Sequence, residues 1–160
     1  MKYTSFIALE LLRIKVATLD DVSALASLRY QWRAGERGEV GLSISAFTDA
    51  LRHWMESHAT SHVPFLGTEG VEPIAMGWLA IVDRIPGPEH FERRSGYLQS
   101  IYVAEPQRSR GVGTALVRFV LGHARGLDLD YVAVHPSHAS FSLYRRLGFT
   151  ESRRVLELRW

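Results

Sequence analysis

Residues 102–116 read Tyr-Val-Ala-Glu-Pro-Gln-Arg-Ser-Arg-Gly-Val-Gly-Thr-Ala-Leu, and this stretch decides the interpretation of the chain. An apolar strand pattern ends at Val103, a basic turn follows, and an amphipathic helix pattern begins at Gly111. The first amides of a helix lack internal partners and together carry roughly half a positive charge. An anion such as a pyrophosphate binds readily at such a place.

The composition of this turn suits a phosphate-binding loop. Gly111 and Gly113 carry no side chain that would keep phosphate oxygens from the backbone, and Arg108 and Arg110 add positive charge. The same string also fits an ordinary basic turn whose glycines permit tight packing, and the spacing alone does not separate the two interpretations. A Walker loop is excluded because the chain has no Gly-Lys pair. A Rossmann fingerprint would need a third glycine and a place in the first strand–helix unit.

Hydrophobic patterns on either side of the turn predict the remaining elements. Strands are expected at residues 12–17, 63–68, 74–82, 96–103, 131–135 and 155–158. Helices are expected after Thr18, from Ser43 or Ser45, from Gly111, and from Pro136-Ser137 to a stop at Gly148. Polar loops are expected at residues 33–41 and 83–95. The order β-α-α-β-β-β-α-β-α-β predicts one mixed α/β (α+β) domain over residues 1–160, with residues 1–10 as a loose extension.

Composition limits the classes of function. The chain has 160 residues, of which 46% are hydrophobic and 22% charged, as in ordinary globular proteins. A net charge of +2 is too small to indicate a nucleic-acid partner. The absence of cysteine excludes disulfides and thiolate catalysis. The N-terminal apolar run is short and is broken by Glu10, so we expect a cytoplasmic protein with no membrane partner. We expect no metal, because the predicted helix ends between His58 and His62.

Two sequence blocks make the chain resemble the GCN5-related N-acetyltransferase (GNAT) superfamily. The first runs from Leu98 to Leu116 and contains the basic turn; the second, residues 140–149, reads Ser-Phe-Ser-Leu-Tyr-Arg-Arg-Leu-Gly-Phe. The resemblance covers nearly the whole chain after its first ten residues. It implies a mostly antiparallel sheet of six to seven strands flanked by about four helices. It also implies acetyl transfer from acetyl-CoA to a primary amine of a small molecule or peptide. Homodimers are common in the superfamily.

The resemblance assigns roles to particular residues. In such proteins the strand before the turn pairs with the pantetheine arm of acetyl-CoA, and the amides of the turn hold its pyrophosphate. Tyr144 would protonate the leaving thiolate, since a phenol of pKa about 10 is able to protonate a thiolate whose thiol has a pKa of about 8.5. The alternative for Tyr144 is a core aromatic, and Ser137 either contacts the cofactor or caps a helix. The implied cofactor-binding residues are Ile101, Tyr102, Val103, Arg108, Ser109, Arg110, Gly111, Val112, Gly113, Thr114 and Ser137.

The chain departs from the superfamily pattern in its general base. Many members carry a glutamate on the acetyl-CoA strand, but residues 93–104 contain no acid. A water chain, Glu36, Glu39 or Asp83 would have to serve instead. The missing acid also leaves open a non-catalytic CoA-binding or sensor module, and the basic isoelectric point leaves open, more weakly, a nucleic-acid binder. Tyr30 and Trp32, expected at the end of the first helix, suggest an acceptor site lined by aromatic side chains.

Overall fold

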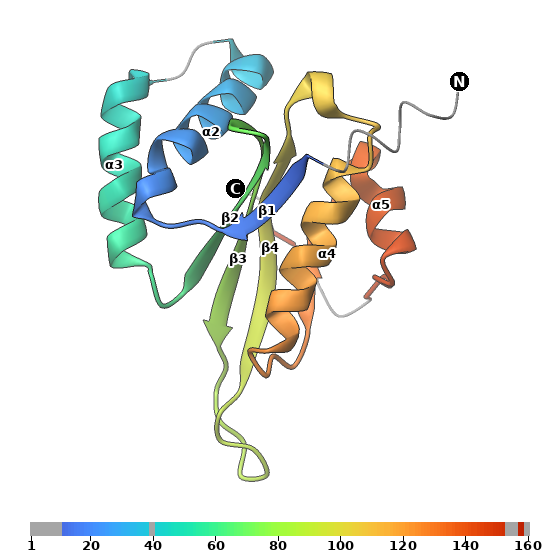
Figure 1. Cartoon of the computed structure of the whole chain (residues 1–160). Coiled ribbons are helices and arrows are strands. Elements are labelled where there is room, and N and C mark those ends of the chain that lie inside the picture. The colour runs from blue at the N-terminus through green and yellow to red at the C-terminus, as the bar shows by residue number, and fades with distance from the viewer. Residues whose placement is uncertain (1–10, 39–40, 153–156, 159–160) are drawn as a thin grey trace.

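The computed structural model describes residues 11–38, 41–152 and 157–158, and shows a twisted sheet with helices on both sides (Figure 1). The strands are β1 (Leu12–Val16), β2 (His62–Glu69), β3 (Glu72–Asp83), β4 (Arg94–Val103) and β5 (Val132–Val134). They lie in the order β1-β2-β3-β4-β5, and all neighbours are antiparallel except the parallel pair β4–β5. The helices are α2 (Val22–Arg37), α3 (Ile44–Ser57), α4 (Val112–Arg125) and α5 (Phe141–Arg146), with short 3₁₀ turns at Leu19–Asp21, Glu105–Gln107 and His138–Ser140.

The predicted fold class is confirmed, and the element order agrees from the first strand to the last helix. The strand count differs from the prediction, because the sheet has five strands in the described part of the chain rather than six to seven. The strand expected at residues 155–158 lies mainly outside the described residues, and Glu157 and Leu158 are not in a strand.

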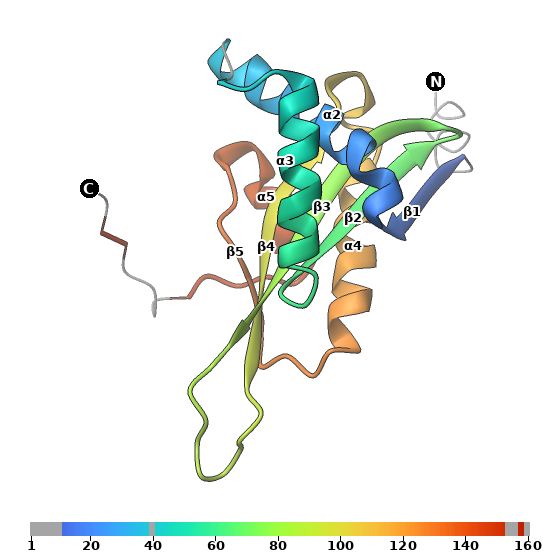
Figure 2. The same cartoon turned by 90° about the vertical axis from the view of Figure 1, so that its left-hand side faces the viewer.

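The sheet separates two hydrophobic clusters. Helices α2 and α3 cover one side, and α4 and α5 lie on the other (Figures 1 and 2). Strand β3 is buried continuously from Ile74 to Ala80, because both of its faces are covered. On the α4 side it packs with Leu116 and Val120, and on the α2 side with Leu25 and other residues of that helix.

Helix α2 is longer than the sequence pattern predicts. We expected it to end near Trp32, with a polar loop from residue 33 to residue 41, but it continues to Arg37. Beyond Trp32, Arg33 and Ala34 are half-buried and Gly35 and Glu36 are exposed, and this stretch has no hydrophobic stripe that would indicate a helix. It is nevertheless built largely from good helix formers, and Arg33 forms an i,i+3 ion pair with Glu36 at 2.7 Å. Gly38, with φ of 75°, ends it.

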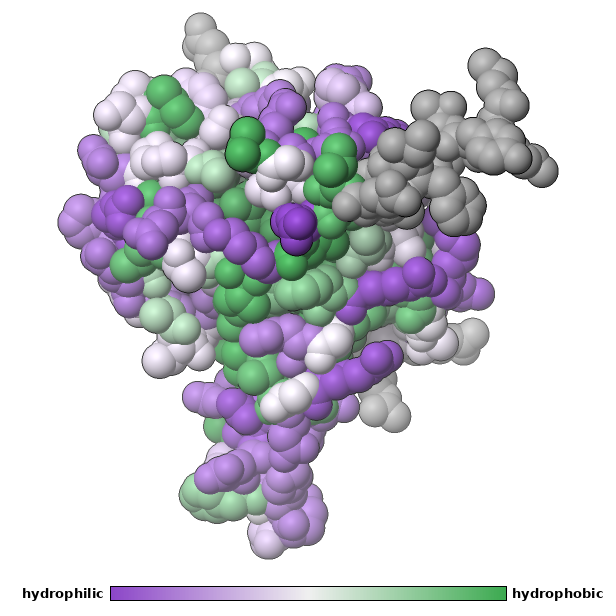
Figure 3. Space-filling view, viewed as in Figure 1, coloured by the Kyte–Doolittle hydropathy of each residue, from purple (hydrophilic) through white to green (hydrophobic). Residues whose placement is uncertain are grey.

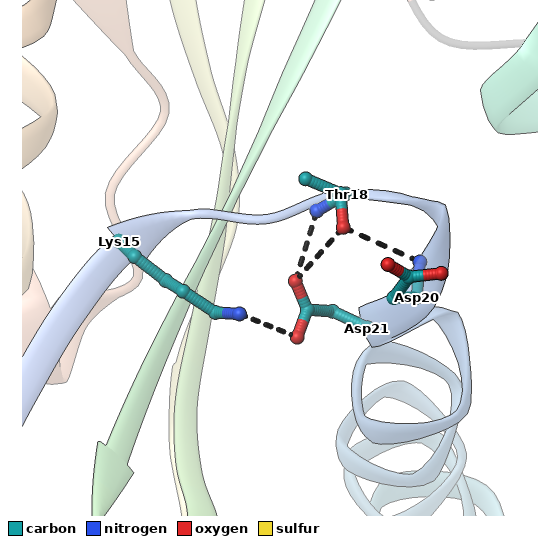
Figure 4. A network of polar contacts seen from close by, with 4 residues as sticks. All are labelled: Lys15, Thr18, Asp20 and Asp21. Atoms are coloured by element: carbon teal, nitrogen blue, oxygen red, sulfur yellow. Dashed lines mark hydrogen bonds and ion pairs between the residues drawn. The ribbon is translucent and has the colours of Figure 1, made fainter.

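A polar network fixes the start of α2 (Figure 4). The Thr18 hydroxyl accepts from the amide of Asp20 at 3.3 Å, and the amide of Thr18 donates to the carboxylate of Asp21 at 2.9 Å. Lys15 of β1 forms an ion pair with the same carboxylate at 2.7 Å. Partial burial raises the pKa of Asp21, but the hydrogen bonds from Lys15 and Thr18 outweigh it and hold the pKa below its usual value. The network therefore ties the first strand to the first helix.

The β3–β4 hairpin extends well beyond the rest of the sheet (Figures 1 and 2). Its surface is largely hydrophilic in the space-filling view (Figure 3). Arg93 near its base forms a salt bridge with Asp130 at 3.0 Å, and the guanidinium of Arg84 lies 5.3 Å from the ring of Tyr131. These contacts fasten the base of the hairpin to the segment that precedes β5.

We predict that Thr18→Ala lowers the free energy of unfolding by about 1 kcal/mol, because it removes the side-chain cap of the turn that starts α2. Thr18→Ser should retain most of that stability. Thr48→Ala is the matched control, since its hydroxyl bonds only the carbonyl of Ile44 within α3. Urea denaturation measures all three variants, and an equal loss in Thr18→Ala and Thr48→Ala would contradict the capping role.

Candidate functional site

The parallel strands β4 and β5 form a fork at one edge of the sheet. β5 pairs only with residues 96–98 of β4. β4 continues past Leu98 to Val103, and over that stretch its side toward β5 has no strand neighbour in the described residues. Unpaired backbone groups along a strand form a template for an extended ligand.

A β-bulge bends β4 just past the fork. The register between β3 and β4 shifts between Met76 and Trp78, and Ser100 has φ of 52°, in the left-handed region. Gly77 of β3 makes room here, because a Cβ on it would lie 2.6 Å from the Cδ1 atom of Ile101. A positive φ at a residue other than glycine is uncommon and concentrates at functional sites.

The backbone beyond the bulge directs polar groups into the fork. The amide of Ala104 donates to the carbonyl of Ile74 on β3 at 2.8 Å. Backbone groups of successive strand residues point to opposite sides. Val103, next to Ala104, therefore directs its N–H and C=O away from β3, and so does Ile101, two residues earlier. The Nε of Arg108 donates to the carbonyl of Val103 at 3.1 Å, which leaves that oxygen a second lone pair.

The turn before α4 presents a row of free amides. The amide of Arg108 donates to the carbonyl of Glu105 at 3.2 Å. The next amide along the chain that has a backbone partner is that of Ala115. The amides of Ser109 to Thr114 donate to no acceptor within the described part of the chain. Ser109 and Gly111 have φ of 61° and 85°, and no side chain caps the helix. Such a curved run of amides at a helix start binds anions.

The two arginines of the turn are engaged with protein atoms. Arg110 forms an ion pair with Glu69 of β2 at 2.8 Å, which offsets its charge. Arg108 bonds to Val103, and its guanidinium lies 5.7 Å from the ring of Tyr102. The charge of Arg110 is therefore offset, whereas Arg108 keeps its charge and its remaining N–H donors beside the free backbone amides.

Helix α5 closes one side of the fork. A Cβ on Gly113 would lie 3.3 Å from Leu143 of α5 and 3.6 Å from Val103 of β4, so turn, strand and helix converge here. Tyr144 is 5% exposed and packs in the hydrophobic cluster on the α4 side of the sheet, with Phe149 at a ring distance of 5.4 Å. Burial raises the pKa of Tyr144 to about 12, so its phenol stays protonated at neutral pH.

Two of the expected cofactor-binding residues, Tyr102 and Ser137, have side chains that contact other parts of the protein. Tyr102 packs its ring on the α2 side, stacked on Trp32 at 5.4 Å, and its backbone is in the phase that faces β3. It therefore directs neither its ring nor its backbone into the fork. Ser137 uses its hydroxyl to cap the His138–Ser140 turn, where it accepts from the amide of Ser140 at 3.3 Å.

The candidate general bases do not gather at the fork. Asp83 ends β3 opposite Arg94, at the far end of the strand pair from the bulge. Glu36 of α2 is held by Trp32 and Arg33 at 2.6 and 2.7 Å. Glu39 lies outside the described residues.

Sequence reasoning missed one side chain beside the bulge, Arg29 of α2. Its guanidinium donates to the hydroxyl of Ser100 at 3.1 Å and lies 4.9 Å from the ring of Trp32. A signal was present in the sequence, because Arg29 falls four residues after Leu25 and three before Trp32, on the helix stripe that is otherwise apolar.

The protein therefore has an α/β fold in which two parallel strands, β4 and β5, separate beside the N-terminus of α4. Within the described residues, the amides at that helix N-terminus are free. The model of the acetyltransferase (GNAT) family matches residues 23–149, and the chain belongs to this family.

Relatives agree with this assignment. An L-methionine sulfoximine/L-methionine sulfone acetyltransferase of Pseudomonas aeruginosa is 31% identical over 106 residues, which cover 64% of this chain and 59% of the relative's own length. A predicted acetyltransferase of Clostridium acetobutylicum, crystallised with acetyl-CoA, has a TM-score of 0.75 at 21% identity, over 92% of this chain and 96% of that one. An aminoglycoside acetyltransferase from an uncultured soil sample, crystallised with sisomicin, has a TM-score of 0.77 at 12% identity, over 94% and 96%. The two structures show a shared fold.

None of the described helices has the length and apolar character that crossing a membrane requires. No three metal-ligating side chains come together in the part of the chain that the structure describes.

We predict that the phenol of Tyr144 stays protonated well above pH 10. With ¹³Cζ-labelled tyrosine, its NMR signal should be unchanged at pH 10, because a pKa of about 12 keeps the phenol neutral there. Tyr144→Phe assigns the signal. The raised pKa stabilises the fold fully below the unfolded value of about 10, and this contribution is lost as the pH rises toward 12. Half-ionisation of Tyr144 near pH 10 would contradict its buried position.

Proposed function

We propose that this protein transfers an acetyl group from acetyl-CoA to a primary amine of a small molecule or peptide. The free amides of Ser109 to Thr114 are the observation that carries the proposal, because unbonded amides at a helix start attract anions and these follow directly after β4. Family membership supports it, as do the acetyl-CoA in the Clostridium acetobutylicum structure and the acetyltransferase activity in the Pseudomonas aeruginosa relative's name.

The residues present fit acetyl-CoA along the whole fork. The amides of the turn would hold the pyrophosphate, with Arg108 and Arg110 at its border. A Cβ on Gly111 would meet nothing within 4 Å, whereas Gly113 lets the turn pack closely against Val103 and Leu143. The backbone groups of Ile101 and Val103 would pair with the amides of the pantetheine arm, as an added strand would. Tyr102 is left out of this assignment, and Ser137 would act through the segment that it caps.

The reaction that follows is a direct transfer. The amine nitrogen attacks the thioester carbonyl carbon, the C–S bond breaks, and an amide forms while the thiolate of CoA leaves. The nitrogen loses a proton and the sulfur gains one, so the products are an N-acetylated acceptor and free CoA. Both reactants would be held together in the fork, because the chain has no cysteine to carry an acyl group.

Tyr144 would supply the proton to sulfur. Its pKa of about 12 keeps the donor protonated throughout the physiological range. No acidic residue stands on β4 to accept the proton of the amine, so water at the fork would carry it away. The cytoplasmic location, the absence of nucleic-acid and membrane partners, and a homodimer remain predictions.

The test is calorimetry with CoA and acetyl-CoA, followed by an assay of thiol release with amines that include L-methionine sulfone, L-methionine sulfoximine, aminoglycosides and short peptides. Binding together with turnover supports the proposal. Binding without turnover for every amine would instead support a non-catalytic CoA-binding module. No binding of either ligand would refute both.

We predict that Gly113→Ala weakens CoA binding about 10- to 100-fold, the cost of losing a charge-assisted hydrogen bond or two at the turn. Its new Cβ would enter the space between Val103 and Leu143. Gly122→Ala makes the same change farther along α4, where a Cβ meets nothing within 4 Å, and should leave binding unchanged. Equal affinities of the two variants would count against the turn as the pyrophosphate site.

We predict that Tyr144→Phe lowers kcat about 100-fold or more while the Kd for CoA changes little, because only the proton donor is removed. Tyr131→Phe, at a tyrosine that is 51% exposed near the hairpin base, is the control and should keep full activity. Rates with acetyl-CoA at saturating amine give the comparison. Full activity of Tyr144→Phe would remove the proposed acid.

A further inference from the structure

Arg29 lies on the α2 side of the sheet, directly over the bulge of β4. Its Nη1 donates to the hydroxyl of Ser100 at 3.1 Å, and its guanidinium faces the ring of Trp32 at 4.9 Å. Ser100 stands two residues beyond Leu98, the last residue of β4 that pairs with β5. Arg29 therefore reaches the point where the two strands part.

Within the described residues, Arg29 forms no ion pair. The nearby Glu36 is engaged by the indole N–H of Trp32 and by Arg33. Burial lowers the pKa of Arg29, and the like charge of Arg33 acts in the same direction, against the opposing effect of Glu36. A half-buried cation without an anion is costly, and a bound anion would relieve that cost.

The surroundings hold the guanidinium in place. Trp32 stacks on Tyr102, with ring centroids 5.4 Å apart and an interplanar angle of 12°, and its N–H is anchored to Glu36 at 2.6 Å. A guanidinium has five N–H donors, of which the contact with Ser100 uses one. A planar group fixed in this way is suited to bidentate recognition of a carboxylate.

We propose that Arg29 binds a carboxylate of the acceptor, so that the acceptor is an amine that also carries a carboxylate, as an α-amino acid does. This proposal rests on the acetyl transfer proposed above. The carboxylate lies against Arg29 on the α2 side of the sheet. The amine of the same molecule then lies at the bulge, beside the fork that holds the thioester.

The test compares acceptors that differ only in this group. L-methionine sulfone, its amide and its decarboxylated amine form one set, and L-phenylalanine, L-phenylalaninamide and phenethylamine form a second. The amide keeps the shape of the acid and removes its charge. Thiol release from acetyl-CoA gives kcat/KM for each, and the acid should exceed its amide and amine by about 10- to 100-fold in the set that the enzyme accepts.

Variants of α2 assign the preference to one side chain. Arg29→Gln should raise KM for the acid about 10- to 100-fold and leave kcat/KM for the amide and amine nearly unchanged, while Arg29→Lys should retain part of the preference. Arg33→Gln removes an equal charge one turn farther along α2 and should keep the full preference. Thermal denaturation of each variant confirms that it folds.

A second readout does not depend on turnover. In CoA-loaded protein with ¹⁵N-labelled arginine, the Nε–H signal of Arg29, assigned with Arg29→Lys, should shift on titration with L-methionine sulfone and L-phenylalanine but not with their amides.

The outcomes separate this inference from the proposed function. Turnover of amides and amines at the rate of the acids would overturn the role of Arg29 and leave acetyl transfer intact. An equal loss for all acceptors in Arg29→Gln would show that Arg29 only supports the bulge, and would also overturn it. Failure to bind CoA would refute the acetyl transfer itself. If neither acid shifts the Arg29 signal, the carboxylate site is refuted, whatever the assay shows.

Discussion

The short parallel pairing of β4 with β5 is the constraint on which the rest of the site depends. β5 pairs with only residues 96–98, and β4 then runs on with its outer edge open. The bulge at Ser100 bends the strand at this point, and Gly77 of β3 makes it possible by leaving room for Ile101. If β5 continued alongside β4, it would pair with this edge, and no open backbone groups would remain there for an extended ligand.

The site draws its electrostatics from the backbone as well as from side chains. Arg110 is paired with Glu69, which offsets its charge, whereas Arg108 bonds to the neutral carbonyl of Val103 and keeps its charge. The free amides from Ser109 to Thr114 are held in position by the left-handed residues Ser109 and Gly111. Fixed dipoles of this kind need no reorganisation when an anion arrives.

The two sides of the sheet carry different parts of the proposed site. On the α4 side, the turn, Gly113 and the buried Tyr144 surround the open edge of β4. On the α2 side, Tyr102, Trp32 and Arg29 form a series of ring and cation contacts that ends at Ser100. Side chains of β4 alternate between the α4 side and the α2 side of the sheet, so residues around the bulge contribute to both sides.

The sequence by itself determined the fold class, the element order as far as the last helix, and the helix start after a basic turn, because each follows from local periodicity and from glycine placement. It failed at the end of α2, where the residues after Trp32 carry no hydrophobic signal. Only the tertiary structure decided that Tyr102 faces away from the fork, that Arg110 is neutralised by Glu69, and that Arg29 reaches Ser100. These depend on strand register and on contacts between residues far apart in the chain, and local patterns contain no information about either.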